Sequence, residues 1–441
     1  MSTRPRITFL GAGSTIFLKN LIGDAFLFDT LSEAEIALYD IDENRLEESR
    51  IIIESLNNSM NLGRAVISTY LGVCNRRDAL KNSDFVINAI QVGGYEPSTV
   101  IDFEIPKKYG LLQTIGDTLG IGGIFRTLRT VPVMLDIVSD MEDVCPDAII
   151  LNYANPMAMV TGAIQKTSEI QTVGLCHSVQ ICAPDLLKSL DMKAEKLRWK
   201  IAGINHMAWL LEIRDGDRDL YPEIKKRAAA KNKMHKHDDM IRFEMMKHFG
   251  YYITESSEHF AEYVPYWIRK DSPELIERYN IPLDEYPRRC IEQIRDWQSR
   301  KQALMAGEEL EHEKTREYGA DIMNAVLSDN PTCIHGNILN TDGYIPNLPS
   351  DAVVEVPCLV DGNGIQGVHS GKLPIQCAAL NQTNINVQQL TIEAVLSRKK
   401  AAVYQAALLD PHTSGELNVE KIIQLCDELF DAHEEWLPEY N

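Results

Sequence analysis

The chain has 441 residues, more than one compact hydrophobic core usually serves, so two domains are expected. Its net charge of −20 disfavours nucleic acids and anionic membrane surfaces as main partners. No apolar run reaches the roughly 18 residues of a membrane-spanning helix, and the amino-terminal residues do not have the pattern of a signal peptide. The 9 cysteines follow no repeating spacing. We therefore expect reduced thiols, a cytoplasmic location, and no nucleic-acid or membrane partner.

Strand and helix patterns alternate along the first part of the chain. Short runs rich in β-branched and aromatic residues occur at 6–13, 34–42, 66–73 and the end of 79–90. Apolar residues with helical spacing lie between them, at 14–27 and 43–60. This alternation is typical of a parallel sheet with helices on both faces. We predict an α/β fold with a Rossmann-like, doubly wound parallel sheet, as in lactate and malate dehydrogenases, over residues 1–198.

A glycine-containing turn joins the first predicted strand to the first predicted helix. Gly11 suits a tight turn, and Gly13 would let a pyrophosphate approach the start of the helix. Ile16 replaces the third glycine of the usual fingerprint. A carboxylate at the end of the second strand can bind the ribose of NAD and would repel the extra phosphate of NADP. The residues expected to bind NAD here are Gly11, Gly13, Ser14, Thr15 and Asp40. The alternative is a glycine turn that binds nothing.

Further polar residues follow the apolar strand predicted within 148–160. Asn152 and Asn155 stand at its end, and Pro156 comes next. In a doubly wound sheet such strand ends face the ligand crevice, so these amides can bind a ribose or substrate hydroxyls. We assign Asn152 to the cofactor and Asn155 to the substrate. The alternative is that both are turn residues before a proline.

Cys176 and His206 each follow an apolar strand-like run. A thiolate with an imidazole suits Mn²⁺, Fe²⁺, Co²⁺, Ni²⁺ or Zn²⁺, and two protein ligands leave positions open, as in catalytic sites. The alternative is a small buried cysteine and a half-buried ring.

Beyond residue 198 the pattern changes. Strand-like 197–215 is followed by long helical segments at 238–250, 283–329 and 375–410, with alternating apolar residues at 343–368. We predict a second, α+β domain over residues 199–441 that binds substrate and mediates oligomerisation.

Several motifs, spread over almost the whole chain, together resemble glycoside hydrolase family 4. They are ITFLGAGST, LYDID, VGGYEP, DTLGIGGIFRTLRT, LNYANPMAM, GLCHSVQ, GINHMAW, ESSEHFAEY and TNINVQ. The resemblance implies NAD and Mn²⁺, or another divalent metal, as cofactors, with Cys176 and His206 as metal ligands. The CHSV motif, which places His177 after the cysteine, is similar to the α-galactosidase branch. The implied activity is hydrolysis of α-galactosides such as melibiose, in a homodimer or homotetramer.

The family is an exception among glycosidases because it does not rely on two carboxylates. The resemblance implies oxidation at C3 of the sugar by NAD, removal of the C2 proton by a base, elimination at C1, addition of water and re-reduction. The favoured base is Tyr263, followed by Glu258 and His259, whereas the rival interpretation of Tyr263 is an aromatic packing residue. His177 is a candidate for protonating the leaving oxygen or for only shaping the pocket.

Asp117 matches a sugar-binding position of the family, together with Asn155, and could alternatively cap a helix. Other activities also stay open: an α-glucosidase or hexuronic-acid glycosidase of the same family, an NAD-dependent 2-hydroxy-acid dehydrogenase, or a non-catalytic NAD or sugar sensor.

Overall fold

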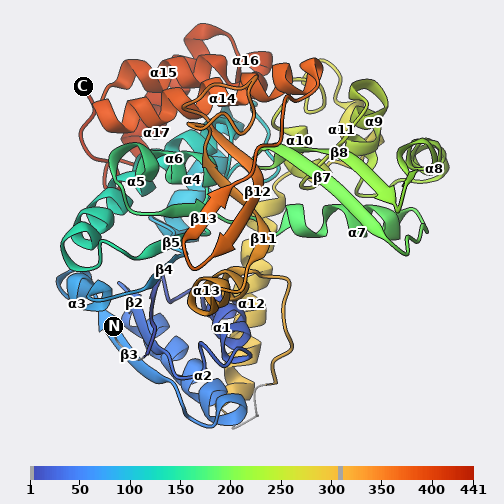
Figure 1. Ribbon diagram of the computed structural model, residues 1–441. Helices are drawn as coiled ribbons and strands as arrows, with labels where there is room; N and C mark the ends of the chain where they lie inside the picture. The colour runs from blue at the N-terminus through green and yellow to red at the C-terminus, as the bar shows by residue number, and fades with distance from the viewer. Residues whose placement is uncertain (1–3, 306–310) are drawn as a thin grey trace.

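The computed structural model describes residues 4–305 and 311–441, and a 13-stranded sheet runs through the described chain (Figure 1). Its central order is β10-β8-β7-β12-β11-β6-β5-β4-β1-β2-β3, with β13 on β12 and β9 on β8. One half of this sheet is parallel and the other is antiparallel.

The parallel half confirms the predicted Rossmann-like sheet. Its strands are β1 (Arg6–Leu10), β2 (Glu35–Asp40), β3 (Val66–Leu71), β4 (Phe85–Asn88), β5 (Ile149–Asn152) and β6 (Thr172–Gly174). The helical segments that connect and extend them are α1 (Thr15–Phe26), α2 (Glu43–Asn61), η1 (Val73–Asn75), α3 (Arg76–Leu80), η2 (Gly94–Thr99), α4 (Val100–Lys108), α5 (Gly120–Val144), α6 (Met157–Thr167) and α7 (Ser178–Ser189). Strands β1, β4 and β5 consist almost entirely of buried residues because helices cover both faces.

The antiparallel half contains β7 (Leu197–Ile204), β8 (Met207–Asp215), β9 (Arg218–Asp219), β10 (Tyr252–Ile253), β11 (Thr332–Leu339), β12 (Val353–Asp361) and β13 (Gly364–Gly367). Strand β11 pairs with β6 through Asn337 and Gly174, so the sheet continues from one half of the chain into the other. The predicted boundary at residue 198 falls within β7 and stays a prediction.

The helices of the second half are α8 (Tyr221–Met234), α9 (Met240–Phe249), α10 (Ser257–Ala261), α11 (Glu274–Arg278), α12 (Glu285–Met305), α13 (Gly319–Ser328), α14 (Ile375–Ser397), α15 (Lys400–Leu409), α16 (Pro411–Glu416) and α17 (Val419–Ala432). Two predicted long helices were wrong in extent. The segment 283–329 divides into α12 and α13, with 306–310 outside the described residues, and 375–410 divides at Arg398, whose positive φ of 57° ends α14.

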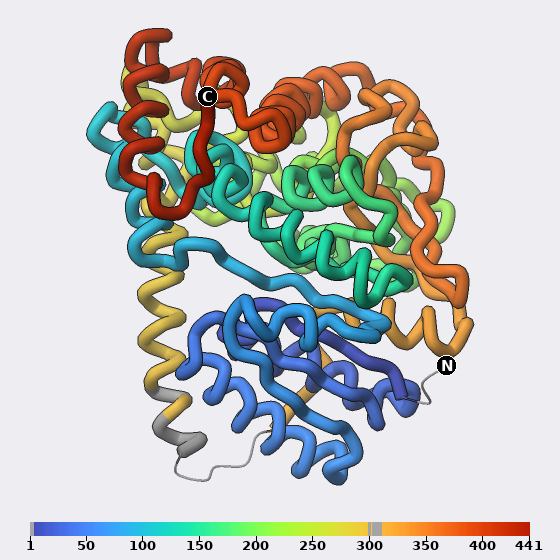
Figure 2. The backbone as a smooth tube through the Cα atoms, turned by 90° about the vertical axis from the view of Figure 1, so that its left-hand side faces the viewer, coloured from blue at the N-terminus to red at the C-terminus, as the bar shows by residue number. Residues whose placement is uncertain are grey.

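Helix α12 connects the two halves of the molecule. Figure 2 shows this helix, in yellow, running down beside the blue amino-terminal segments. The Trp297 indole N–H donates to Glu48 of α2 at 2.8 Å. Among the described residues, no helix is both long and apolar enough to cross a membrane.

Candidate active site

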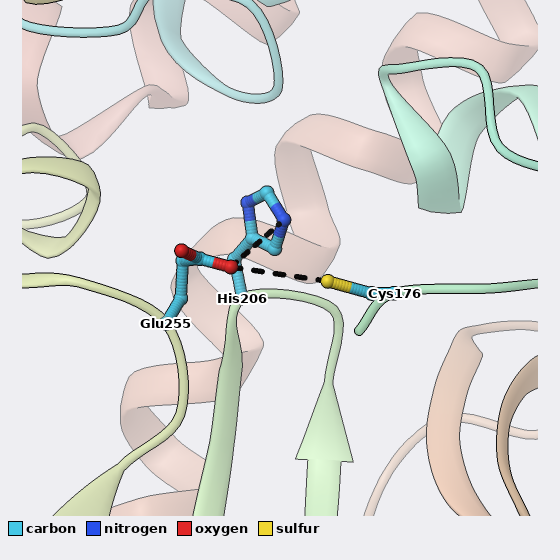
Figure 3. A group of neighbouring side chains, drawn as sticks. All are labelled: Cys176, His206 and Glu255. Carbon is cyan, nitrogen blue, oxygen red and sulfur yellow. Dashed lines mark hydrogen bonds and ion pairs between the residues drawn. The ribbon is translucent and has the colours of Figure 1, made fainter. Parts of the chain in front are cut away.

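Three side chains from distant parts of the chain converge to form a candidate metal site (Figure 3). Cys176 follows β6, His206 lies in the turn between β7 and β8, and Glu255 follows β10. The Glu255 Oε2 atom is 3.8 Å from Cys176 Sγ and 3.5 Å from His206 Nε2. The three ligand atoms all lie within 4.8 Å of one another. The structure therefore brings together the two predicted ligands and adds a third.

Backbone conformation marks the two turns that carry this site. His206 and Glu255 have φ values of 61° and 62°, which residues other than glycine adopt uncommonly. Such conformations cost free energy and concentrate at functional sites. Sequence reasoning missed Glu255 as a ligand, although it lies within the stretch that holds the candidate bases and is the first residue of the ESSEHFAEY motif. Its acidic side chain was the available signal, but nothing local distinguished it from its neighbours.

The charges at this site favour a bound cation. Burial raises the pKa of the Cys176 thiol well above its usual value, and Glu255 adds to the rise. Burial lowers the pKa of His206 to about 4, which leaves its ring neutral at neutral pH. Burial acts to raise the pKa of Glu255, but His259 and His206 hold it well below its usual range. A neutral imidazole, an ionised carboxylate and a thiol that a metal would deprotonate form a suitable donor set for a divalent transition metal.

Tyr318 holds the backbone at Cys176. Its hydroxyl accepts a hydrogen bond from the Cys176 N–H at 3.0 Å. The same hydroxyl lies 2.9 Å from the carbonyl oxygen of Cys176 and 3.1 Å from that of His335, so it can donate to either. The Cys176 thiol also lies 3.1 Å from the Ser178 hydroxyl. These contacts fix where the sulfur points.

Two of the predicted catalytic residues lie at the metal site. The Tyr263 hydroxyl is 2.9 Å from His206 Nδ1, so Nε2 of the same ring is left facing Glu255. Tyr263 is fully buried, and burial raises the pKa of its hydroxyl well above the usual value. The His259 ring lies 4.9 Å from the His206 ring, and the Ser256 hydroxyl holds its Nδ1 at 2.7 Å.

Glu258 points elsewhere. Its carboxylate pairs with Arg289 of α12 at 2.5 Å, within a cavity of about 740 Å³ that Ser256, Glu285 and Arg288 also line. Its role as a base stays a prediction, and its ion pair favours a structural one.

The predicted substrate residues contact each other. The Asn155 side-chain amide donates to Asp117 Oδ2 at 3.0 Å, and the Arg126 guanidinium donates to the Asn155 carbonyl at 3.2 Å. Helix α5 begins after Leu119 without a side-chain cap, so Asp117 is not its capping residue. His177 is 58% exposed, and its Nδ1 lies 3.9 Å from Glu317 Oε1.

The glycine turn and Asp40 also meet. Gly11 has φ 79°, and a Cβ atom there would lie 2.7 Å from the Ala89 carbonyl oxygen. The Gly13 N–H donates to Asp40 Oδ2 at 2.6 Å, which places this carboxylate beside the start of α1. Ser14 precedes α1 without capping it, and the Thr15 hydroxyl donates to the Gly13 carbonyl at 3.3 Å. This geometry suits a dinucleotide.

Asn152 is fully buried at the end of β5. Its side chain accepts from Asn88 at 2.8 Å and donates to Thr161 at 3.0 Å. It braces two adjacent strand ends, and its contact with a cofactor stays a prediction.

Comparison with known proteins covers both halves of the chain. The model of the family 4 glycosyl hydrolases matches residues 6–192, and the model of their C-terminal domain matches residues 201–413. An α-galactosidase of Bacillus subtilis (strain 168) is 58% identical over 99% of each chain. One of Rhizobium meliloti (strain 1021) is 33% identical over 99% of this chain and 89% of its own. A 6-phospho-α-glucosidase from gut microorganisms, solved with NAD and Mn²⁺, shares the fold with a TM-score of 0.79 at 21% identity, covering 99% of this chain and 100% of that one.

Proposed function

The chain belongs to family 4 of the glycosyl hydrolases, and we propose that it is an α-galactosidase acting on small α-galactosides such as melibiose. The observation that carries the sugar specificity is the 58% identity to the Bacillus subtilis α-galactosidase over nearly the full length of both chains. Family membership sets aside the interpretations as a 2-hydroxy-acid dehydrogenase and as a sensor without catalysis.

We propose NAD and Mn²⁺ as the cofactors. NAD would be held by the turn of Gly11 and Gly13 with Asp40, and the metal by Cys176, His206 and Glu255, together with the residues that support them. When bound, NAD supplies a reversible redox step at the sugar, and the divalent cation supplies Lewis-acid polarisation of the sugar oxygens. The relative solved with NAD and Mn²⁺ supports this pairing.

We assign the remaining roles to side chains around the candidate metal site. Asp117 and Asn155 present a carboxylate and an amide suited to binding sugar hydroxyls. Tyr263 stays the favoured base because its hydroxyl lies within the cluster, with His259 as the next candidate. His177 follows the metal cysteine and is exposed enough to reach a ligand, which suits protonation of the leaving oxygen.

The test is reconstitution under a thiol reductant. The protein is stripped with chelator and supplied with NAD⁺, Mn²⁺, both or neither, against aryl α-galactoside, α-glucoside and α-galacturonide. We expect hydrolysis of the galactoside only when both cofactors are present. Hydrolysis with neither would overturn the redox mechanism, and preference for the glucoside or the galacturonide would replace the proposed sugar with that of the rival glycosidases.

A matched pair of variants tests the third metal ligand. Glu255→Gln removes the carboxylate of the cluster, and we expect Mn²⁺-dependent activity to fall by at least about a hundredfold. Glu244→Gln removes a carboxylate on α9 that pairs with Lys247, and we expect it to keep full activity. Equal activity of the two variants at limiting Mn²⁺ would remove Glu255 from the metal site.

We also propose a cytoplasmic homodimer or homotetramer. The 9 cysteines are all free, which agrees with a reducing compartment. Light scattering after size-exclusion chromatography measures the oligomer, and a monomer at working concentration would contradict this part of the proposal.

A further inference from the structure

One buried glutamate, Glu262, connects the candidate metal site to the proposed sugar-binding residues. Glu262 lies directly after α10, is only 3% exposed, and precedes Tyr263, the residue that bonds His206. Among the described residues, Glu262 is not one of the three side chains of the candidate metal site. Its carboxylate points instead into the turn of residues 113–117, which leads from α4 towards α5 and ends at Asp117.

Three successive backbone N–H groups of this turn converge on the Glu262 carboxylate. The Thr114 N–H donates to Oε2 at 2.9 Å and the Gly116 N–H donates to Oε1 at 2.7 Å. The Ile115 N–H, between them, lies 3.3 Å from both oxygens. Consecutive amides arranged in this way form a nest that suits an anion, and here a side-chain carboxyl group of the same protein occupies it. Burial raises the pKa of this carboxyl group to about 7, although the amides of the nest act to lower it.

The turn depends on this carboxyl group as an acceptor. Gly116 has φ 56°, a left-handed conformation in which all three amides face one point. Without an acceptor, three buried N–H groups would lack partners, and each such group costs stability. The Thr114 hydroxyl adds a bond to the Glu258 carbonyl at 2.7 Å, and the Tyr286 N–H donates to the Thr114 carbonyl at 3.0 Å. These two bonds hold the Thr114 end of the turn, whereas the carboxyl group of Glu262 accepts from all three of its N–H groups.

We infer that Glu262 is a positioning residue for sugar binding, because its carboxyl group fixes the turn that presents Asp117. The next residue, Tyr263, contacts His206 and so connects this turn to the candidate metal site. The inference rests on the proposed function, because it takes Asp117 as a ligand of the sugar. Glutamine has nearly the same shape, but its NH₂ group would face an N–H of the nest. Glu262→Gln should therefore let the turn shift and move Asp117 away from its position beside Asn155.

The experiment compares Glu262→Gln with wild type as holoenzyme, with NAD⁺ and Mn²⁺ present. We expect kcat/KM for the aryl α-galactoside to fall by at least about tenfold, mainly through KM, and the Kd of free galactose to rise by a similar factor. The Kd values of NAD⁺ and Mn²⁺ should stay within about twofold of wild type, because the nest contacts neither site directly. Glu416→Gln is the matched control: Glu416 is also a buried glutamate that accepts a backbone N–H, from Lys270 at 2.9 Å, but outside the site. We expect this control to behave as wild type.

A double-mutant cycle with Asp117→Ala separates positioning from general stability. If Glu262 acts through Asp117, adding Glu262→Gln to Asp117→Ala should cost little further activity. Fully additive losses of activity would overturn the inference. A folded Glu262→Gln variant whose KM and galactose Kd are unchanged would also overturn it. So would a folded variant that loses the binding of NAD⁺, Mn²⁺ and sugar to the same extent. If Glu262→Gln does not fold, Glu262→Asp, which keeps the charge but cannot span the nest, is measured in its place.

Activity and sugar binding of the wild type show separately whether the proposed sugar is correct and whether Glu262 has the role given to it. If wild type prefers an α-glucoside or α-galacturonide, the proposed sugar falls, and the same ratios measured with that substrate decide the role of Glu262. If wild type neither hydrolyses nor binds any glycoside, both fall together.

Discussion

Tyr318→Phe tests how far the position of Cys176, the proposed metal ligand, depends on the buried hydroxyl of Tyr318. The hydroxyl accepts from the Cys176 N–H at 3.0 Å and donates to the carbonyl oxygen of Cys176 or His335. Phenylalanine keeps the ring but removes both bonds and leaves a buried N–H without its partner. An unsatisfied buried group costs about 1–3 kcal/mol and the second bond about 0.5–1.5 kcal/mol. We therefore expect the free energy of unfolding to fall by about 2–4 kcal/mol.

Equilibrium urea denaturation of the metal-free protein measures this loss, and Mn²⁺ titration measures its consequence for the site. Because the backbone that positions the sulfur is released, we expect Mn²⁺ affinity to fall by about ten- to a hundredfold. Tyr344→Phe is the control, because within residues 4–305 and 311–441 the Tyr344 hydroxyl donates only to Asp342, at an exposed position. We expect this variant to lower the free energy of unfolding by less than about 0.5 kcal/mol. If the two variants have equal stability and Mn²⁺ affinity, the role given to Tyr318 is wrong.

Three further predictions follow from the same geometry. Cys176→Ser and His206→Ala should fold normally yet lose metal-dependent activity; turnover unchanged at saturating Mn²⁺ would remove the metal assignment. The Asp40 carboxylate should repel the 2′-phosphate of NADP⁺, so we expect the wild type to prefer NAD⁺ over NADP⁺ by at least about tenfold and Asp40→Ala to reduce that preference. Equal activation of the wild type by both cofactors would refute this role of Asp40. Burial lowers the pKa of His335 to about 4, below its unfolded value near 6.5, so its contribution to stability is complete above about pH 6.5 and is lost as pH falls towards 4. When the pH falls from about 7 to about 5, the free energy of unfolding measured with urea should decrease by about 2 kcal/mol more for the wild type than for His335→Gln. Equal decreases in the two proteins would contradict the lowered pKa of His335.

Local patterns of residues were enough to predict several parts of this protein. Alternating strand and helix periodicity predicted the parallel sheet because a strand buried on both faces must be apolar along its length. The glycine turn and Asp40 could be placed at strand ends in advance, because that placement follows from local pattern, and the structure brings them into contact; their binding of NAD stays a prediction. Cys176 and His206 were recognisable as a pair of donor types next to strand ends, and the resemblance of the motifs made the pair specific.

The contacts of three similar acidic residues, in contrast, depend on how distant parts of the chain pack together. Glu255, Glu258 and Glu262 lie within one short stretch. Glu255 joins Cys176 and His206 in the candidate metal site, Glu258 pairs with Arg289, and Glu262 accepts hydrogen bonds from three backbone amides. Periodicity could not separate them, because Glu255 precedes α10, Glu258 lies within this short helix and Glu262 follows it. Their partners stand far away in the chain: Cys176 is 79 residues before Glu255, and Gly116 is 146 residues before Glu262. Contacts at such separations follow from how strands and helices pack, which no local pattern of residues records.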